Sequence, residues 1–148
     1  MNILVMDGQG GRLGAQLVRN ILERFPQAEL TAIGTNATAT AAMVKAGARK
    51  AATGTNPAIV ACRKAQVIIG PIGIVIADAM LGEITPEMAV AVGQADATRI
   101  LLPVNRCENQ VAGVGELSTG QLMDDAMARL EELLSRQTCC HTHGYHTV

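Results

Sequence analysis

The chain has 148 residues, of which 49% are apolar and 17% charged, and its formal net charge is −1. This length suits one domain with a sizeable core. Nucleic-acid binding needs clustered Lys and Arg and often aromatic rings for base stacking, so the near-neutral charge, with Phe25 and Tyr145 as the only aromatic residues, argues against a nucleic-acid partner.

The first half of the chain alternates between short β-rich runs and longer runs with helical spacing. The predicted strands are residues 3–6 and 30–33, with residues 51–56 as a short strand or a loop. The predicted helices are residues 13–25, 37–46 and 57–65. Pro26 ends the first helix and Gly47 caps the second, while Pro57 suits the first position of the third.

The second half continues the alternation. Its predicted strands are residues 67–69 and 100–102, with residues 110–114 as a further short candidate. Its predicted helices are residues 86–95, with Thr85 as cap, and residues 119–134, with Ser118 as cap. Residues 74–81 fit either a continued strand or a helix, and their periodicity does not decide between the two.

Strands that alternate with helices of this length are typical of a parallel sheet covered on both faces. Right-handed crossovers bring the carboxyl ends of such strands to one edge, where ligands bind in open α/β sheets. Glycine or small polar residues follow four of the predicted strands, at residues 7–11, 34–36, 70–73 and 105–107. We therefore expect the binding site at this edge.

Residues 8–14 read Gly-Gln-Gly-Gly-Arg-Leu-Gly and lie between the first predicted strand and helix. Glycine lets a loop approach a phosphate closely, and a helix N-terminus offers free amides. The spacing departs from Gly-x-Gly-x-x-Gly, because Leu13 stands at the third glycine, but Gly8, Gly11 and Gly14 fit a looser Gly-x-x-Gly-x-x-Gly pattern. The loop either binds a nucleotide or phosphorylated ligand, or its glycines only permit close packing of the helix on the strand.

The acidic residue that holds the ribose in dinucleotide sites is missing after the second predicted strand, where Gly34, Thr35 and Asn36 stand instead. Thr35 and Asn36 remain able to bind a ribose or a 2′-phosphate. No Gly-Lys-Ser/Thr follows the glycine loop, which excludes a Walker-type loop. The residues expected to hold the ligand are, for the phosphate, Gly8, Gly10, Gly11 and Arg12 and, for the remainder, Asp7, Thr35, Asn36, Asn105 and Arg106.

Six motifs together carry a family resemblance: Asp-Gly-Gln-Gly-Gly at 7–11, Ile-Gly-Thr-Asn at 33–36, Lys-Ala-Gly-Ala at 45–48, Gly-Pro-Ile-Gly-Ile at 70–74, Met-Leu-Gly-Glu-Ile-Thr-Pro at 80–86 and Leu-Leu-Pro-Val-Asn-Arg-Cys at 101–107. Over about residues 2 to 135 the chain resembles a bacterial family, domain of unknown function 3842. The resemblance implies a three-layer Rossmann-like α/β fold with a mostly parallel, doubly wound sheet. It implies no established activity and no catalytic residue.

All three histidines lie in the last eight residues, so the body of the chain has no histidine to act as a general base. Catalysis there would have to use a lysine or one of the residues Asp7, Asp78, Glu83 and Cys107. Asp7 either contacts the ligand or accepts backbone amides of the glycine turn. Cys107 follows Arg106, whose charge would favour the thiolate, but a buried and unreactive thiol is the alternative.

Residues 138–148 lie beyond the resemblance, and we divide the chain into an α/β domain, residues 1–137, and a C-terminal tail. The tail contains five candidate ligands for zinc or copper: Cys139, Cys140, His141, His143 and His146. Their spacing matches no zinc-finger pattern. Without a secretory signal, the cysteines are expected as thiols rather than disulfides.

The leading hypothesis is a cytoplasmic protein that binds a nucleotide, such as NAD(P), or another phosphorylated small molecule at the sheet edge. No signal peptide is recognisable, and the apolar stretch 67–81 is too short to cross a bilayer, so we expect no membrane partner. A homo-oligomer remains open. One alternative is an enzyme, either an NAD(P)-linked reductase or a transferase that uses Cys107; another is a metal-handling or assembly protein that acts through the tail.

Overall fold

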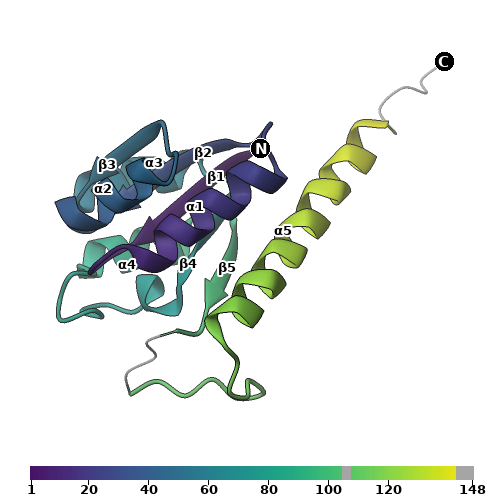
Figure 1. Ribbon diagram of the computed structural model, residues 1–148. Coiled ribbons are helices and arrows are strands. Elements are labelled where there is room, and N and C mark those ends of the chain that lie inside the picture. Colours follow the sequence, from purple (N-terminus) through teal and green to yellow (C-terminus); the bar gives the residue numbers. More distant parts are fainter. Residues whose placement is uncertain (105–107, 143–148) are drawn as a thin grey trace.

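The structure is a computed structural model that describes residues 1–104 and 108–142, with side chains through Cys139. Five strands form one sheet in the order β3-β2-β1-β4-β5, and every neighbouring pair is parallel (Figure 1). The strands are β1 (Asn2–Asp7), β2 (Glu29–Gly34), β3 (Lys50–Thr53), β4 (Val67–Pro71) and β5 (Thr98–Leu102). The chain therefore has the predicted three-layer, Rossmann-like α/β fold, and its sheet is parallel throughout the described residues.

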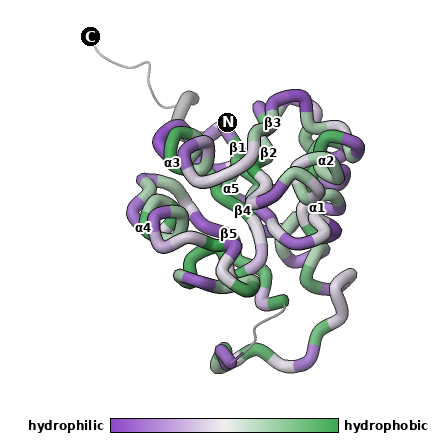
Figure 2. Tube along the Cα trace, turned by 90° about the vertical axis from the view of Figure 1, so that its left-hand side faces the viewer, coloured by the Kyte–Doolittle hydropathy of each residue, from purple (hydrophilic) through white to green (hydrophobic). Residues whose placement is uncertain are grey.

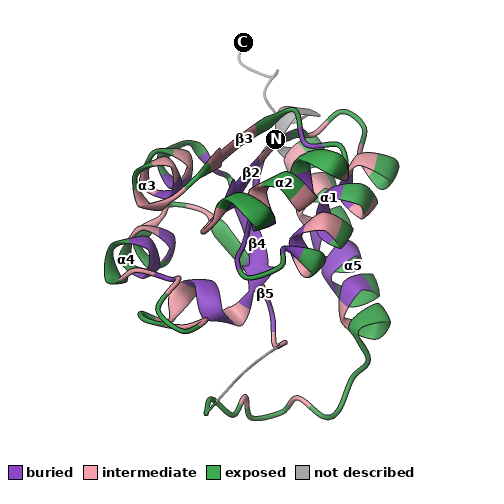
Figure 3. Cartoon of the chain, turned by 60° about the vertical axis from the view of Figure 1, so that its left-hand side comes forward, coloured by how far each residue is buried: buried purple, intermediate pink, exposed green. Residues whose placement is uncertain are grey.

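Helices cover both faces of this sheet (Figures 1 and 3). The helices on one face are α1 (Arg12–Arg24), α2 (Ala37–Lys45) and α5 (Thr119–Thr142). The helices on the other face are α3 (Thr55–Lys64), α4 (Pro86–Gln94) and the short 3₁₀ helix η1 (Ile72–Val75). Each face buries its own apolar core.

The central strand β1 contributes to both cores. Ile3 and Val5 belong to the core beneath α1 and α5, whereas Leu4 and Met6 belong to the core beneath α3 and α4. Successive side chains of a strand point to opposite faces, so a strand buried on both sides is apolar without interruption. Figure 2 shows the apolar strands in the middle of the molecule and hydrophilic segments on the outer turns of the helices.

The strand order reverses beside β1. From β1 the chain passes through α1 and β2 to α2 and β3 at one edge of the sheet, and α3 then returns it to β4 on the opposite side of β1. The connections that leave the carboxyl ends of β1 and β4 run to opposite faces of the sheet, and open α/β sheets bind their ligands at such a point. The glycine loop follows β1 there, and η1 follows β4.

Three of the helix starts have side-chain caps, two of them predicted from sequence. The Oγ1 of Thr85 accepts the amide of Met88 at 3.2 Å, and Pro86 opens α4. The Oγ of Ser118 accepts the amide of Gln121 at 3.1 Å, and the Gln121 side chain accepts the Ser118 amide in return. Before α2, the Oδ1 of Asn36 accepts the amide of Ala39 at 2.8 Å.

Several boundaries differ from the sequence predictions. The third helix begins at Thr55, not at Pro57, because Gly54 turns the chain with a φ of 108°. Residues 74–81 are neither strand nor α-helix: they include the end of η1 and a series of turns. Residues 110–114 form no strand. The final helix continues through Thr142, into the segment predicted as a tail.

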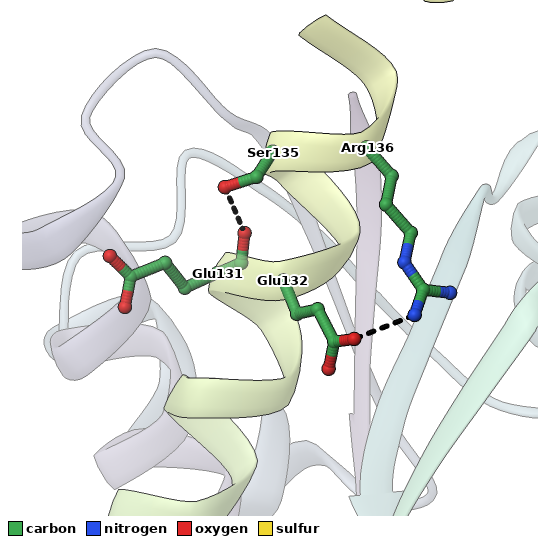
Figure 4. Close-up of polar contacts among 4 residues, drawn as sticks. All are labelled: Glu131, Glu132, Ser135 and Arg136. Carbon is green, nitrogen blue, oxygen red and sulfur yellow. Dashed lines mark hydrogen bonds and ion pairs between the residues drawn. The ribbon is translucent and has the colours of Figure 1, made fainter. Parts of the chain in front are cut away.

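The outer face of α5 is polar and solvent-exposed. Arg136 pairs with Glu132 at 2.6 Å, and the Ser135 hydroxyl donates to the carbonyl of Glu131 (Figure 4). One turn earlier, Arg129 pairs with Asp125 at 2.7 Å. Pairs this exposed contribute only a few tenths of a kcal/mol each. The contribution of α5 to stability therefore comes from its inner face, which carries Leu130.

Within the described residues, no helix has the length and apolar character needed to cross a membrane.

Leu130→Ala is expected to lower the free energy of unfolding by about 2–5 kcal/mol, because Leu130 has no exposed surface in the core beneath α1. Truncation after Gln137 is expected to change it by less than about 0.5 kcal/mol, because Thr138 and Cys139, the described side chains of the removed segment, are exposed. Urea denaturation of both variants measures the difference. A truncation as damaging as Leu130→Ala would show that the tail contributes to the core.

Candidate functional site

A small cavity of about 140 Å³ lies at the reversal of strand order. The glycine loop forms most of its wall, together with residues from the ends of β4 and β5 and from the connection between β4 and α4. The lining residues are Asp7, Gly8, Gln9, Gly10, Gly11, Arg12, Leu13, Pro71, Met80 and Val104. A larger hollow of about 750 Å³ lies between α3 and α4, away from the strand ends.

Three glycines of the loop are required by packing. A Cβ on Gly8 would lie 2.6 Å from Thr35 Oγ1 and 2.7 Å from Met80 Sδ. Gly11 has a φ of 71°, and a Cβ there would meet the backbone of Ala39. A Cβ on Gly14 would lie 2.7 Å from Met43 Sδ. Gly11 and Gly14 thus allow α1 to lie close to α2 and β1, whereas Gly8 allows the loop to lie against Thr35 and Met80.

Gly10 differs from these three. A Cβ at this position would meet no atom within 4 Å, and its φ is not among the positive ones. The fold therefore does not require glycine here. Gly10 lines the cavity, so a side chain at this position would extend into the open space of the loop.

The loop leaves three backbone amides without an acceptor among the described residues. The amides of Gly8 and Gly14 donate to Asp7, and that of Gly11 donates to the carbonyl of Gly8. The amide of Gln9 donates to Glu83. The remaining amides of the loop and the start of α1 are those of Gly10, Arg12 and Leu13, all residues that line the cavity. Unpaired amides at a helix N-terminus, with the positive end of the helix dipole, favour an anion.

Asp7 lies beneath this loop and is only 5% exposed. Its Oδ1 accepts the amide of Gly8 at 2.8 Å and its Oδ2 accepts the amide of Gly14 at 2.7 Å. Burial raises the pKa of the carboxyl, the two amides oppose this, and the charge of Glu83 adds to the increase, so the pKa is raised overall. Of the two roles that the sequence leaves open for Asp7, this geometry corresponds to the second, in which the carboxylate accepts backbone amides. Asp7 thereby connects the glycine turn to the first turn of α1.

Glu83 brings a second carboxylate to the loop, from the connection between β4 and α4. Its Oε1 accepts three hydrogen bonds: from the amide of Gln9 at 3.0 Å, from the hydroxyl of Thr35 at 2.8 Å and from the side-chain amide of Asn36 at 2.6 Å. Burial disfavours its charge, but the three donors outweigh burial and lower the pKa of the carboxyl. Glu83 is therefore ionised at neutral pH.

The position of Glu83 changes how the end of β2 is understood. The sequence lacks an acidic residue there, and Thr35 and Asn36 are expected to contact the ligand directly. In the structure both side chains donate to Glu83. A carboxylate is thus present at the end of β2, supplied by another part of the chain. From sequence, Glu83 is only one of several residues able to catalyse, because nothing local pairs it with residues 47 and 48 positions earlier.

A compact turn delivers Glu83 to this position. The amide of Asp78 donates to the carbonyl of Ile84 at 2.8 Å, and the amide of Ile84 donates to the carbonyl of Ala79 at 3.1 Å. Asp78, Met80 and Leu81 all have positive φ, and this is incompatible with the helix that residues 74–81 allowed. Leu81, at the tip, is fully exposed.

The structure places the other predicted residues as follows. Arg12 is exposed beside the cavity. Asn105, Arg106 and Cys107 lie outside the described residues, as do the side chains of Cys140, His141, His143 and His146. Cys139 is exposed, and the described part of the chain contains no cluster of three potential metal ligands. Cys62 is buried in α3, and burial raises the pKa of its thiol to about 11, as expected of a packing residue.

A family model, described as a domain of unknown function (DUF3842), matches residues 2–135. The chain belongs to this family. The match extends from β1 into α5 and contains both the glycine loop and Glu83, whereas the Cys/His-rich tail lies beyond it. No curated protein matches the chain.

Asp7→Asn is expected to lower the free energy of unfolding at pH 7 by about 1–3 kcal/mol, because an amide NH₂ would face a backbone donor and leave it unpaired in a buried place. Chemical denaturation measures this effect. Asp96→Asn, at an exposed position, is the matched control and should change little. Equal stability of the two variants would contradict the role assigned to Asp7.

Glu83→Gln is expected to be less stable than the wild type at neutral pH, and the difference should shrink in acid. Because the folded-state pKa of Glu83 is lowered, its stabilisation is present above the ordinary pKa of 4.5 and is lost as pH falls through the lowered value. Melting temperatures of both proteins between pH 3 and 7 check this. A difference that grows in acid would contradict the assigned hydrogen bonds.

Proposed function

We propose that the protein binds a nucleotide or another phosphorylated small molecule, with its phosphate against the N-terminus of α1. The observation that carries this proposal is the set of three unpaired amides, those of Gly10, Arg12 and Leu13, on one cavity at the reversal of strand order. A phosphate oxygen accepts such amides readily, and the dipole of α1 favours its charge.

The charges around the cavity support an anionic ligand at this end. Asp7 also lines the cavity, and both of its carboxylate oxygens already accept amides of the loop. Arg12, at the first position of α1, is exposed beside the cavity and able to contact a phosphate from the solvent side.

Gly10 adds a separate argument. The fold needs glycine at positions 8, 11 and 14 but has room for a side chain at position 10. Position 115 has room for a side chain as well, but Gly10 also lines the cavity, where a glycine would allow a ligand to approach the backbone closely, as at the second glycine of dinucleotide sites. The proposal concerns binding, with NAD(P) among the candidate ligands, and leaves the reaction open.

Thermal unfolding in the presence of NAD, NADP, ADP, ATP or inorganic phosphate tests the proposal. A ligand at about 100 times its dissociation constant adds roughly 2.7 kcal/mol, or about 5–10 °C for a domain of this size. No shift with any of these at millimolar concentration would exclude the proposed site.

Gly10→Val is expected to abolish the shift while leaving the melting temperature of the free protein nearly unchanged, because its Cβ meets no protein atom. Gly115→Val is the matched control: position 115 also has room for a Cβ and lies outside the cavity. This variant should keep the full ligand-induced shift. Loss of the shift in both variants, or in neither, would contradict the placement of the ligand on the glycine loop.

A further inference from the structure

The carboxylate of Glu83 is held firmly on one side only. All three of its hydrogen bonds go to Oε1, and Oε2 has no partner among the described residues. No side-chain oxygen is both buried and unpaired within those residues, so Oε2 is in contact with solvent. Glu83 therefore presents one fixed, free acceptor at the end of β2.

This acceptor lies next to the proposed phosphate site. Glu83 bonds the amide of Gln9, a residue that lines the cavity, and a Cβ on Gly8 would lie 3.4 Å from Oε1. In parallel sheets that bind nucleotides, the ribose lies beside the end of the second strand while the phosphates lie on the helix N-terminus. A nucleotide with its phosphates on Gly10 and Arg12 would accordingly bring its ribose towards Glu83.

The same arrangement disfavours a phosphate on the ribose. Thr35 and Asn36, the donors that a 2′-phosphate would need, already donate to Glu83. The pKa of Glu83 is lowered, so its negative charge is present at neutral pH and would repel a second anion at short distance. A ribose hydroxyl, by contrast, donates to a carboxylate oxygen favourably.

We infer that Glu83 makes this site selective for nucleotides with a free ribose 2′-hydroxyl and against those with a 2′-phosphate. The inference rests on the proposed function and assigns its specificity to a residue outside the glycine loop. Glu83 replaces the acidic residue that the end of β2 lacks.

Calorimetric titration of the unmodified protein with two ligand pairs is the first test. NAD and NADP differ only in the 2′-phosphate, and we expect NADP to bind at least about 10-fold more weakly. ADP and 2′-deoxy-ADP differ only in the 2′-hydroxyl, and we expect the deoxy compound to bind about 5–10-fold more weakly, since it lacks a hydrogen bond to a charged group. Both comparisons are independent of how any variant folds.

The Glu83→Gln variant tests whether Glu83 causes the selectivity. The amide oxygen can keep the bond from Gln9, while the charge is removed, so the ratio of NADP to NAD dissociation constants should fall to within about 3-fold. Glu87→Gln, an exposed position in the first turn of α4, removes the same charge outside these contacts and should keep the wild-type ratio.

The outcomes separate the two claims. If NAD and NADP bind the wild type equally and Gly10→Val blocks both, the proposed function stands and the selectivity is wrong. If the wild type discriminates but Glu83→Gln retains the full ratio, Glu83 only fastens the turn to the glycine loop and the inference is overturned. If none of the four ligands binds the wild type, the inference fails, and the proposed function fails with it when ATP and inorganic phosphate also give no thermal shift.

Discussion

The buried carboxylate of Asp7 is the contact on which the geometry of the site depends. Its two oxygens bind the amide at the start of the glycine loop and the amide of Gly14 in the first turn of α1. A single side chain thereby sets both the direction of the loop and its distance from the helix. The amides that remain unpaired are consequences of this arrangement, because Asp7 uses those on either side of them.

The second constraint is the connection from β4 to α4. It passes over the end of β1 and reaches β2, where Glu83 joins the amide of Gln9 to the side chains of Thr35 and Asn36. Hydrogen bonds to the Oε1 atom of Glu83 thus join the loops that follow β1, β2 and β4. Because these hydrogen bonds join loops that follow neighbouring strands, the relative position of the two proposed subsites is set by the sheet rather than by any single loop.

Most of the fold follows from local patterns. The apolar run of β1, the cap at Thr85 and the cap at Ser118 are each determined by residues a few positions apart, and all of them match the structure. The start of α3 was misplaced because the effect of Pro57 is local and recognisable, while the turn at Gly54 depends on a backbone angle that sequence does not reveal.

The site itself was only half predictable. The glycine loop is contiguous, so its position and its free amides follow from sequence, but which glycines serve packing depends on distant side chains such as Met43 and Met80. The turn that carries Glu83 has three non-glycine residues with positive φ, a conformation without a sequence pattern. Its contact with β2 joins segments far apart in the chain, beyond the reach of periodicity.

The all-parallel register has a consequence for how the chain acquires this fold. Within the described residues no two neighbouring strands are joined by a hairpin: Asn2 pairs with Glu29, and Ile3 pairs with Val67. The innermost strand is therefore made first during synthesis but gains its second neighbour only after nearly half of the chain has emerged. Non-local pairing of this kind slows folding and leaves apolar strand edges open in the meantime. The edge of β1 that pairs with β4 therefore stays open until β4 has been synthesised.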